Sequence, residues 1–352
     1  MHPPQNVVIM RALQLGDLLC AVPAFRALRR AWPNTRITLI GLPWARDFVH
    51  RLPYLDDFIE FPGFPGLPES VPDLTRLERF LETVRARQFD LAIQLHGNGR
   101  ITNRLIAMLG AQRTAGFHVR GQPCPDLESF LPWPEDQPEI RRLLALTRHL
   151  GIPDCGEALE LPILAEEEMA YAHLRAELPL GHPTYICLHP GARQPSRRWL
   201  PERFAWVADC LAAAGQDIVL TGAATEVPLV AEIRERMHAP AIDLAGHTTL
   251  GTLAAVVAGA QLVVCNDTGM SHVACAVGTP SVVISSGADA QRWRPLDAVR
   301  HRYLWHPVPC RPCAFDVCPT GHECAAGVGV DTVVMAALSL LAPFPENHHA
   351  AP

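Results

Sequence analysis

The chain alternates short apolar runs with amphipathic segments, and this alternation constrains the fold more than any other feature. The runs at 7–13, 37–43 and 90–97 have the length of strands and are mostly apolar. The segments at 16–32 and 74–89 carry apolar residues at the three- and four-residue spacing of a helix. A strand that is apolar on both faces must be covered on both, as in a parallel sheet between two helix layers. The first half is therefore predicted to be a doubly wound α/β domain.

The same alternation restarts near residue 184, after a stretch rich in Pro and Gly. With 352 residues the chain is long enough for two sizeable cores. We predict a first domain over 1–175 and a second over 176–330, each Rossmann-like, with the carboxyl ends of their strands lining a cleft between them. The C-terminal segment at about 331–352 begins with an apolar helix, which we expect to pack back on the first domain.

Composition places the chain among ordinary globular enzymes. It is 49% hydrophobic and 19% charged, with a formal net charge of −6, which argues against a dedicated nucleic-acid binder. No uninterrupted apolar segment approaches the roughly 18 residues of a membrane-spanning helix. The beginning of the chain lacks a basic region before a clean apolar core and is interpreted as a first strand instead of a signal peptide. We therefore expect a cytoplasmic protein.

Four of the eleven cysteines cluster near the C-terminus, at Cys310, Cys313, Cys318 and Cys324. The first two have the spacing of a zinc or iron ligand pair, but the other spacings are less regular than in a zinc ribbon. Reduced packing cysteines are favoured, and a structural metal or disulfides are the alternatives. We expect no metal and no cofactor.

A polar loop follows the first predicted strand. Gly16 permits a tight turn there, and Asp17 lies at or near the start of a helix. Asp17 could be an ordinary helix-capping residue. The alternative is a carboxylate that acts as a general base at the edge of the sheet.

Three further loops, all in the second half, have features of an anion site. Gly191, Ala192 and Arg197 lie in a Gly- and Arg-containing loop that could hold phosphate oxygens, or could simply be a solvated basic loop. Glu226 opens a helix and either caps it or accepts hydrogen bonds from a ribose diol. The strand ending in Asp267-Thr268-Gly269 leads into a helix whose N-terminus favours an anion, with His272 one turn further on.

Taken together, these segments resemble glycosyltransferase family 9, the lipopolysaccharide heptosyltransferases. The matching segments span most of the chain in the order of the family: LGDLLCAVPAFRALRRAWP, DLAIQLHGNGR with GAQRTAGF, HPGARQPSRRWLPERF, TGAATE, DLAG and NDTGMSHVACAVGTP. The combination of an early Gly-Asp, His-Pro-Gly-Ala and Asp-Thr-Gly-x-x-His is specific, although none of the three is specific alone.

The resemblance implies a GT-B fold, in which two Rossmann-like domains face a central cleft. The N-terminal domain would bind the acceptor, typically an inner-core sugar of lipopolysaccharide, and the C-terminal domain the donor, typically ADP-L-glycero-β-D-manno-heptose. The resemblance also assigns roles by position, with Asp17 as the general base and Arg197 in place of a phosphate-binding lysine. The implied donor-binding residues are Gly191, Ala192, Arg197, Glu226 (for the ribose), Asp267, Thr268, Gly269 and His272.

Several alternatives remain open. A nucleotide-sugar epimerase would share the fold and the nucleotide site, and a sensor could keep the phosphate loops without catalysis. The acceptor could be a protein, since related enzymes modify serines. Arg100 and Arg104 could bind acidic core sugars or could be solvated helix residues. If the acceptor is a lipid, a peripheral contact with the inner face of the membrane is expected.

Overall fold

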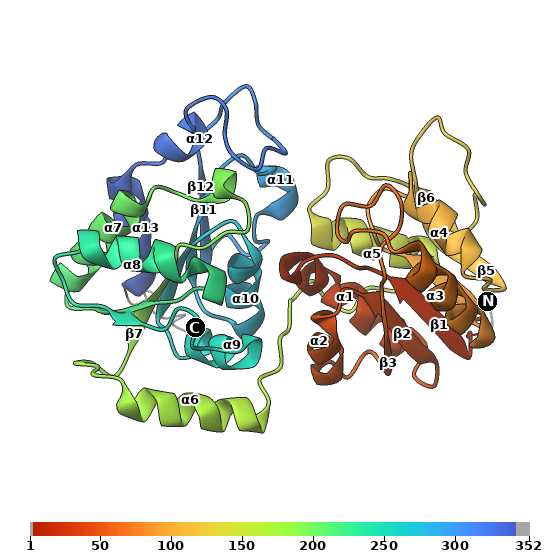
Figure 1. Ribbon diagram of the computed structural model, residues 1–352, viewed down its shortest axis with the longest axis horizontal. Coiled ribbons are helices and arrows are strands. Elements are labelled where there is room, and N and C mark those ends of the chain that lie inside the picture. The colour runs from red at the N-terminus through yellow and green to blue at the C-terminus, as the bar shows by residue number, and fades with distance from the viewer. Residues whose placement is uncertain (1–2, 343–352) are drawn as a thin grey trace, which may run out of the picture. The chain divides into compact units, whose positions relative to one another are not determined.

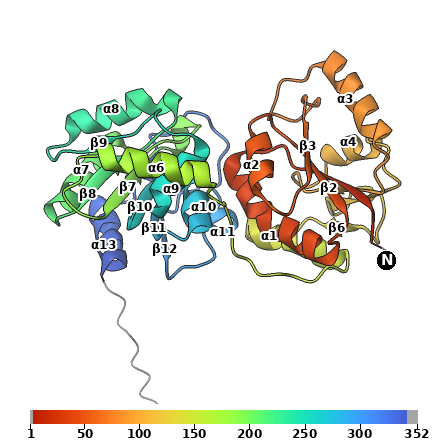
Figure 2. The same cartoon turned by 90° about the horizontal axis from the view of Figure 1, so that it is seen from below.

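The computed structural model describes residues 3–342 (Figure 1). The chain divides into two compact units, Met1–Pro162 and Ile163–Pro352. Each unit contains a parallel six-stranded sheet with helices on both faces (Figures 1 and 2). This confirms the doubly wound α/β prediction for both halves. No helix within residues 3–342 is both long enough and apolar enough to cross a membrane.

The sheet of the first unit has the strand order β3-β2-β1-β4-β5-β6. Alternate residues of β1 point to opposite faces, so Val8 and Met10 pack against the helices α3 and α4 while Val7 and Ile9 face the other layer. Helix α5 packs on α1. The strands are β1 Asn6–Met10, β2 Arg36–Gly41, β3 Asp57–Glu60, β4 Leu91–Gln94, β5 Arg113–His118 and β6 Phe130–Pro132. The helices are α1 Leu15–Ala31, α2 Ala45–Arg51, α3 Leu74–Ala86, α4 Thr102–Met108 and α5 Glu139–His149.

The sheet of the second unit has the order β12-β11-β10-β7-β8-β9. Its strands are β7 Tyr185–His189, β8 Asp217–Leu220, β9 Ile242–Asp243, β10 Leu262–Asn266, β11 Ser281–Ser285 and β12 His301–Trp305. Its helices are α6 Ala165–Glu177, α7 Pro201–Ala213, α8 Val227–Arg236, α9 Leu250–Ala258, α10 Gly269–Val277, α11 Ala290–Trp293, α12 Glu323–Ala326 and α13 Val330–Leu341, with short 3₁₀ turns η1 Pro195–Arg197 and η2 Ala224–Glu226.

Two helices belong to a different unit from the one predicted. Helix α6 falls in the predicted first domain, but it packs on α9 of the second unit, and its Tyr171 hydroxyl lies 3.0 Å from the Tyr185 hydroxyl in β7. The predicted boundary at residue 175 therefore moves back to residue 162.

The C-terminal helix α13 is also corrected. Val333, Ala337 and Leu340 are buried in the core that α7, α8 and the sheet of the second unit share, instead of on the first domain. An apolar stripe specifies that a helix is buried but leaves open which sheet covers it. The remainder of the predicted C-terminal segment, residues 343–352, lies outside the described residues.

The second core contains a buried histidine at the start of β12. His301 is 6% exposed, and its Nδ1 lies 2.9 Å from Ser281 Oγ. Burial lowers the pKa of His301 to about 4, although the charge of Asp297 opposes the shift. The unfolded chain therefore binds a proton near pH 6.5 that the folded chain does not take up until about pH 4.

We predict that His301→Gln makes stability less sensitive to acid. In the wild type, this histidine should cost about 2 kcal/mol of unfolding free energy as the pH falls from 7 to 4.5, because only the unfolded state is protonated in that window. Urea unfolding of both proteins at several pH values measures the difference. His50→Gln, which changes an exposed histidine of α2, is the control. Equal pH dependence of the wild type and His301→Gln would contradict the prediction.

Candidate functional site

In each sheet, polar side chains gather where the strand order reverses. The reversal lies between β1 and β4 in the first unit and between β7 and β10 in the second. Ligands of doubly wound sheets bind in the crevice that such a reversal opens at the carboxyl ends of the strands. The loops after these four strands are therefore the candidate site residues of each unit.

Asp17 lies shortly after β1, in the first turn of α1. The N-cap residue is Gln14, so Asp17 is the third residue of the helix and not the cap. A carboxylate in a first turn is stabilised by the helix dipole. Its side chain is 20% exposed, which leaves it accessible to a substrate.

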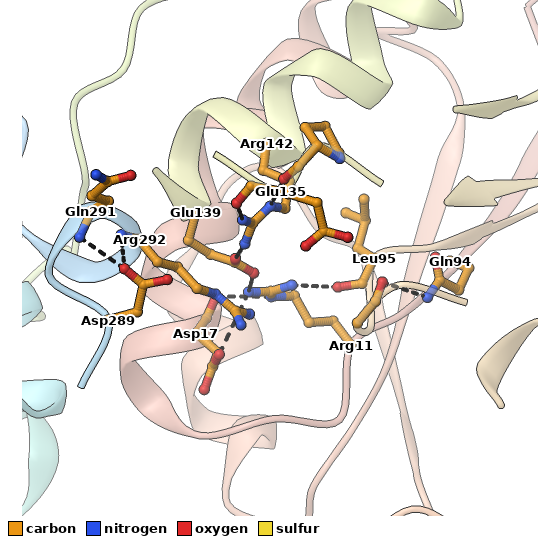
Figure 3. A network of polar contacts seen from close by, with 12 residues as sticks. Arg11, Asp17, Gln94, Leu95, Glu135, Glu139, Arg142, Asp289, Gln291 and Arg292 are labelled. Carbon is orange, nitrogen blue, oxygen red and sulfur yellow. Dashed lines mark hydrogen bonds and ion pairs between the residues drawn. The ribbon is translucent and has the colours of Figure 1, made fainter. Parts of the chain in front are cut away.

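Asp17 contacts a buried arginine that sequence reasoning did not single out. Arg11 is fully buried, and its Nε donates a hydrogen bond of 2.8 Å to the Asp17 carbonyl (Figure 3). Its Nη2 lies 3.9 Å from Asp17 Oδ1 and 3.1 Å from Glu139 Oε1. The signal in the sequence was a charged residue directly after an apolar strand, which must find partners if it is buried.

In the second unit, one buried amide joins the loops after β7 and β10. Asn266, the last residue of β10, donates to the Pro190 carbonyl at 2.7 Å and accepts from the Trp199 amide at 2.9 Å. Asn266 is fully buried. It therefore fixes the predicted anion loop relative to β10, a role that the sequence motif did not reveal.

Glu226 packs directly against the glycine of that loop. Its carboxylate accepts the Ala223 amide at 2.8 Å, so the predicted capping role is present. A β-carbon added to Gly191 would lie 2.2 Å from the carboxylate, which explains why glycine occupies this position. The Glu226 carboxylate is 3.8 Å from His189 Nε2, and burial lowers the pKa of this histidine. The ribose contact of Glu226 stays a prediction.

Asp267 follows β10 and is held by hydroxyl donors. Tyr303 and Ser285 both donate to its Oδ2. Although part of its surface is exposed, dense packing around the carboxyl removes hydration and raises the pKa of Asp267. These two hydroxyls and the charges of Arg197 and Arg311 partly offset that rise.

The start of α10 has the features of an anion-binding helix N-terminus. Thr268 is the N-cap residue, and its hydroxyl accepts from the Met270 amide at 3.4 Å. Gly269 is the first helical residue. His272 lies one turn further on, is buried, and packs edge-on against Trp293. Asp267, Thr268, Gly269 and His272 thus share one strand-to-helix connection, as the sequence predicted, while Ala192 is buried in the neighbouring loop.

Arg197 binds backbone carbonyls of two other loops. Its Nη1 donates to the Ser286 carbonyl at 2.9 Å, and its Nη2 donates to the Cys313 carbonyl. The guanidinium therefore joins the loop after β7 to the loop after β11 and to the cysteine segment. These bonds use two of the five N–H donors of the guanidinium, and the phosphate contact of Arg197 stays a prediction.

The cysteine segment packs against the same loops. The Ser196 amide donates to the Asp316 carbonyl at 2.9 Å, and Arg311 donates to both the carbonyl and the hydroxyl of Ser285. Cys310 is exposed, Cys313 and Cys318 are half-buried and Cys324 is buried; all four are free thiols. Among residues 3–342, no group of three or more His, Cys, Asp or Glu side chains is arranged to hold a metal.

The predicted acceptor residues lie on the surface of the first unit. Arg100 precedes α4 and Arg104 lies within it, and both side chains are exposed. Because both side chains are exposed, they could contact acidic sugars or could simply be solvated, the two alternatives that the sequence leaves open.

A family model described as glycosyltransferase family 9 (heptosyltransferase) matches residues 77–323, well over half of the chain. The chain belongs to glycosyltransferase family 9. The match includes all the predicted donor-binding residues, from Gly191 to His272, but begins after Asp17. The recognition of the family from sequence is therefore confirmed, and the role of Asp17 stays a prediction.

Similar proteins agree with this assignment. The family 9 chain is 26% identical over 308 residues to lipooligosaccharide heptosyltransferase 2 of Haemophilus influenzae, across 83% of this chain and 86% of that protein. The crystal structure of a family 9 glycosyltransferase from Veillonella parvula matches with a TM-score of 0.79 at 21% identity, over 96% of this chain and 97% of that one. The ADP-heptose lipopolysaccharide heptosyltransferase II of E. coli matches with a TM-score of 0.74 at 20% identity, over 96% and 98% of the two chains. The structural likeness confirms the predicted GT-B fold.

We predict that Gly191→Ala destabilises the family 9 chain by roughly 2 kcal/mol, because the added methyl group overlaps the Glu226 carboxylate. Thermal or urea unfolding measures the change. In a Glu226→Ala background the collision is removed, so the same substitution should cost less than about half as much. Equal costs in both backgrounds would show that Glu226 is not the obstacle.

Proposed function

We propose that this family 9 protein is an inverting heptosyltransferase, which moves a heptose from an ADP-heptose to a sugar of the lipopolysaccharide core. The observation that carries the proposal is the Asn266 side chain, which ties the loop after β7 to the end of β10, three residues before α10 begins. A helix N-terminus with a nearby glycine loop is suited to a diphosphate. The names of the similar proteins support the heptose and the lipopolysaccharide acceptor.

In this proposal the second unit binds the donor. The amides at Thr268 and Gly269 and the dipole of α10 bind the diphosphate, assisted by the loop at Gly191 and Ala192. Arg197 contributes its positive charge and the N–H donors that the Ser286 and Cys313 carbonyls leave available. A carboxylate oxygen of Glu226 accepts a hydrogen bond from the ribose, and His272 lies near the sugar.

Catalysis in this proposal is a single displacement. As the bond between the sugar and the diphosphate breaks, positive charge develops on the sugar and negative charge on the leaving group, which the amides and Arg197 stabilise. Asp17 removes the proton from the acceptor hydroxyl as that oxygen attacks the opposite face of the sugar. Inversion at the anomeric carbon follows from one displacement.

We infer that transfer needs no divalent ion, because amides, helix dipole and arginine charge can stabilise the diphosphate. We expect the activity after incubation with excess EDTA and gel filtration to stay within about twofold of the untreated value. Elemental analysis of the treated protein confirms that metal was removed. A loss of activity that zinc, iron or magnesium restores would contradict this inference and would direct attention to Cys310–Cys324.

The function as a whole is tested by supplying ADP-heptose and truncated lipopolysaccharide cores to the purified protein. We expect release of ADP and a product heavier by one heptose, with the opposite anomeric configuration to the donor. Conversion of donor alone into a new epimer would instead favour an epimerase. Labelling of a protein but not of the glycan would favour a protein acceptor.

Loss of transfer in Arg100→Ala or Arg104→Ala, with normal donor binding, would support the contact of these two arginines with the core sugars.

The site of action follows from the acceptor. If the acceptor is a lipid-linked core, we propose that the enzyme works in the cytoplasm, at the inner face of the membrane. Sedimentation with vesicles that contain the acceptor, compared with vesicles of the same lipids alone, measures this contact.

We predict that Asp17→Asn lowers kcat by about 10³-fold or more, because an amide cannot accept the proton of the acceptor hydroxyl. Donor affinity should stay within about twofold, since Asp17 has no part in the nucleotide site. Transfer kinetics and ADP-heptose titration measure the two effects. Asp47→Asn, which removes an exposed first-turn acid of α2, is the matched control. Near-normal turnover of Asp17→Asn would remove Asp17 from the base role.

A further inference from the structure

The first unit contains a row of buried charges that the donor site does not use. Arg11, Glu139 and Arg142 are each at most 2% exposed. With Asp17 they form a chain of alternating sign from the edge of the sheet into the interior (Figure 3). Burying ions is costly, and such pairs are often no more stable than apolar residues of the same size. Stability alone is therefore a weak reason for this arrangement.

Arg11 is bonded in three directions. Its Nε donates to the Asp17 carbonyl at 2.8 Å, its Nη1 to the Leu95 carbonyl, and its Nη2 to Glu139 at 3.1 Å. These partners lie at the start of α1, after β4 and on α5. The planar guanidinium can satisfy all three only in one orientation. That orientation also places Nη2 3.9 Å from Asp17 Oδ1.

Glu139 determines the orientation of Arg11. Its Oε1 accepts from Arg11 and its Oε2 accepts from Arg142 at 2.7 Å, so each oxygen binds one arginine. Glu139 is the first residue of α5, where the helix dipole favours its negative charge, and α5 packs on the helix that carries Asp17.

Arg142 in turn is anchored on its far side. It donates to the carbonyls of Pro134 and Glu135, and its guanidinium lies 4.3 Å from the ring centroid of Trp133. The row is thus fixed at its inner end and reaches Asp17 at the other. A shift of Glu139 would be transmitted to Arg11 and from there to Asp17.

The signs of the charges also matter for a base. Arg11 places its positive charge beside the Asp17 carboxylate, with Nη2 3.9 Å from Oδ1. Glu139 binds the same nitrogen at 3.1 Å and compensates part of that charge. The buried guanidinium therefore stays paired while it orients Asp17.

We propose that Arg11 and Glu139 are positioning residues for transfer, with Glu139 acting on Asp17 through Arg11. The inference rests on the proposed role of Asp17 as the base. It makes α5, which packs on α1, part of the machinery that prepares the acceptor hydroxyl.

The test compares Glu139→Gln and Arg11→Lys with the wild type in transfer assays. Glutamine keeps the shape of Glu139 without its charge, and lysine keeps the charge of Arg11 without its three-directional fork. We expect each to lower kcat by about 10- to 100-fold, because small misplacements of a reacting group have effects of this size. The KM for donor should stay within about twofold.

Combination with Asp17→Asn separates positioning from a general structural effect. If Glu139 acts through Asp17, the Glu139→Gln substitution should lower the residual activity of Asp17→Asn no further. A structural effect would lower both backgrounds equally. Thermal unfolding and donor titration show that each variant is folded. If Glu139→Gln does not fold, Arg11→Lys and its combination with Asp17→Asn decide the question.

Glu160→Gln is the matched control. Glu160 pairs with Arg26, which also lies on α1, and it accepts from Tyr54, so it belongs to a different ion pair from the row of Arg11, Glu139 and Arg142. We expect it to lower the unfolding temperature while kcat stays within about twofold.

Normal kcat in both Glu139→Gln and Arg11→Lys, with Asp17→Asn inactive, would overturn this inference and leave the proposed function intact. Normal kcat in Asp17→Asn would instead overturn the base role on which it rests.

Discussion

A parallel sheet covered on both faces leaves few places where polar side chains can meet. The middle of each strand is buried, and a polar group there must be fully paired. The loops at the carboxyl ends are the remaining positions, and only where the strand order reverses do neighbouring loops diverge enough to leave space. Both units of this family 9 chain have their candidate site residues at that reversal, after β1 and β4 in one and after β7 and β10 in the other.

In both units, a buried polar side chain joins the segments that follow the two strands at the reversal. In the first unit, Arg11 joins the loop after β1 to the Leu95 carbonyl after β4. In the second, Asn266 at the end of β10 joins the Pro190 carbonyl after β7 to the Trp199 amide. Each is a fully buried polar side chain with several backbone partners. Such a side chain is costly to move, because every lost bond leaves a buried group unsatisfied. The bonds of Arg11 and Asn266 therefore resist displacement of the loops that they join, although loops are usually the mobile parts of a domain.

Much of this arrangement could be predicted from the sequence. The strands predicted at 7–13, 37–43 and 90–97 and the connection from Asp267 to His272 depend on local patterns, and the structure has strands and a strand-to-helix connection there. The unit to which α6 and α13 belong depends on long-range packing that an apolar stripe does not encode. Arg197 was predicted from charge near a glycine, but its carbonyl partners come from loops about 90 and 116 residues away. Arg11 and Asn266 were missed because their roles depend on partners distant in the sequence.

Asp267 shows how the proposed anion site could tolerate a carboxylate. A diphosphate beside an ionised acid would be repelled, and burial already raises the pKa of Asp267. Its Oδ2 accepts from Tyr303 and Ser285, and Ser285 is in turn bonded by Arg311, so the acid is directed toward β11 and β12. In the proposed function, the attraction for phosphate then has to come from the amides that follow, at Thr268 and Gly269. Asp267 would thus orient the connection between β10 and α10, and the helix N-terminus would meet the charge of the donor.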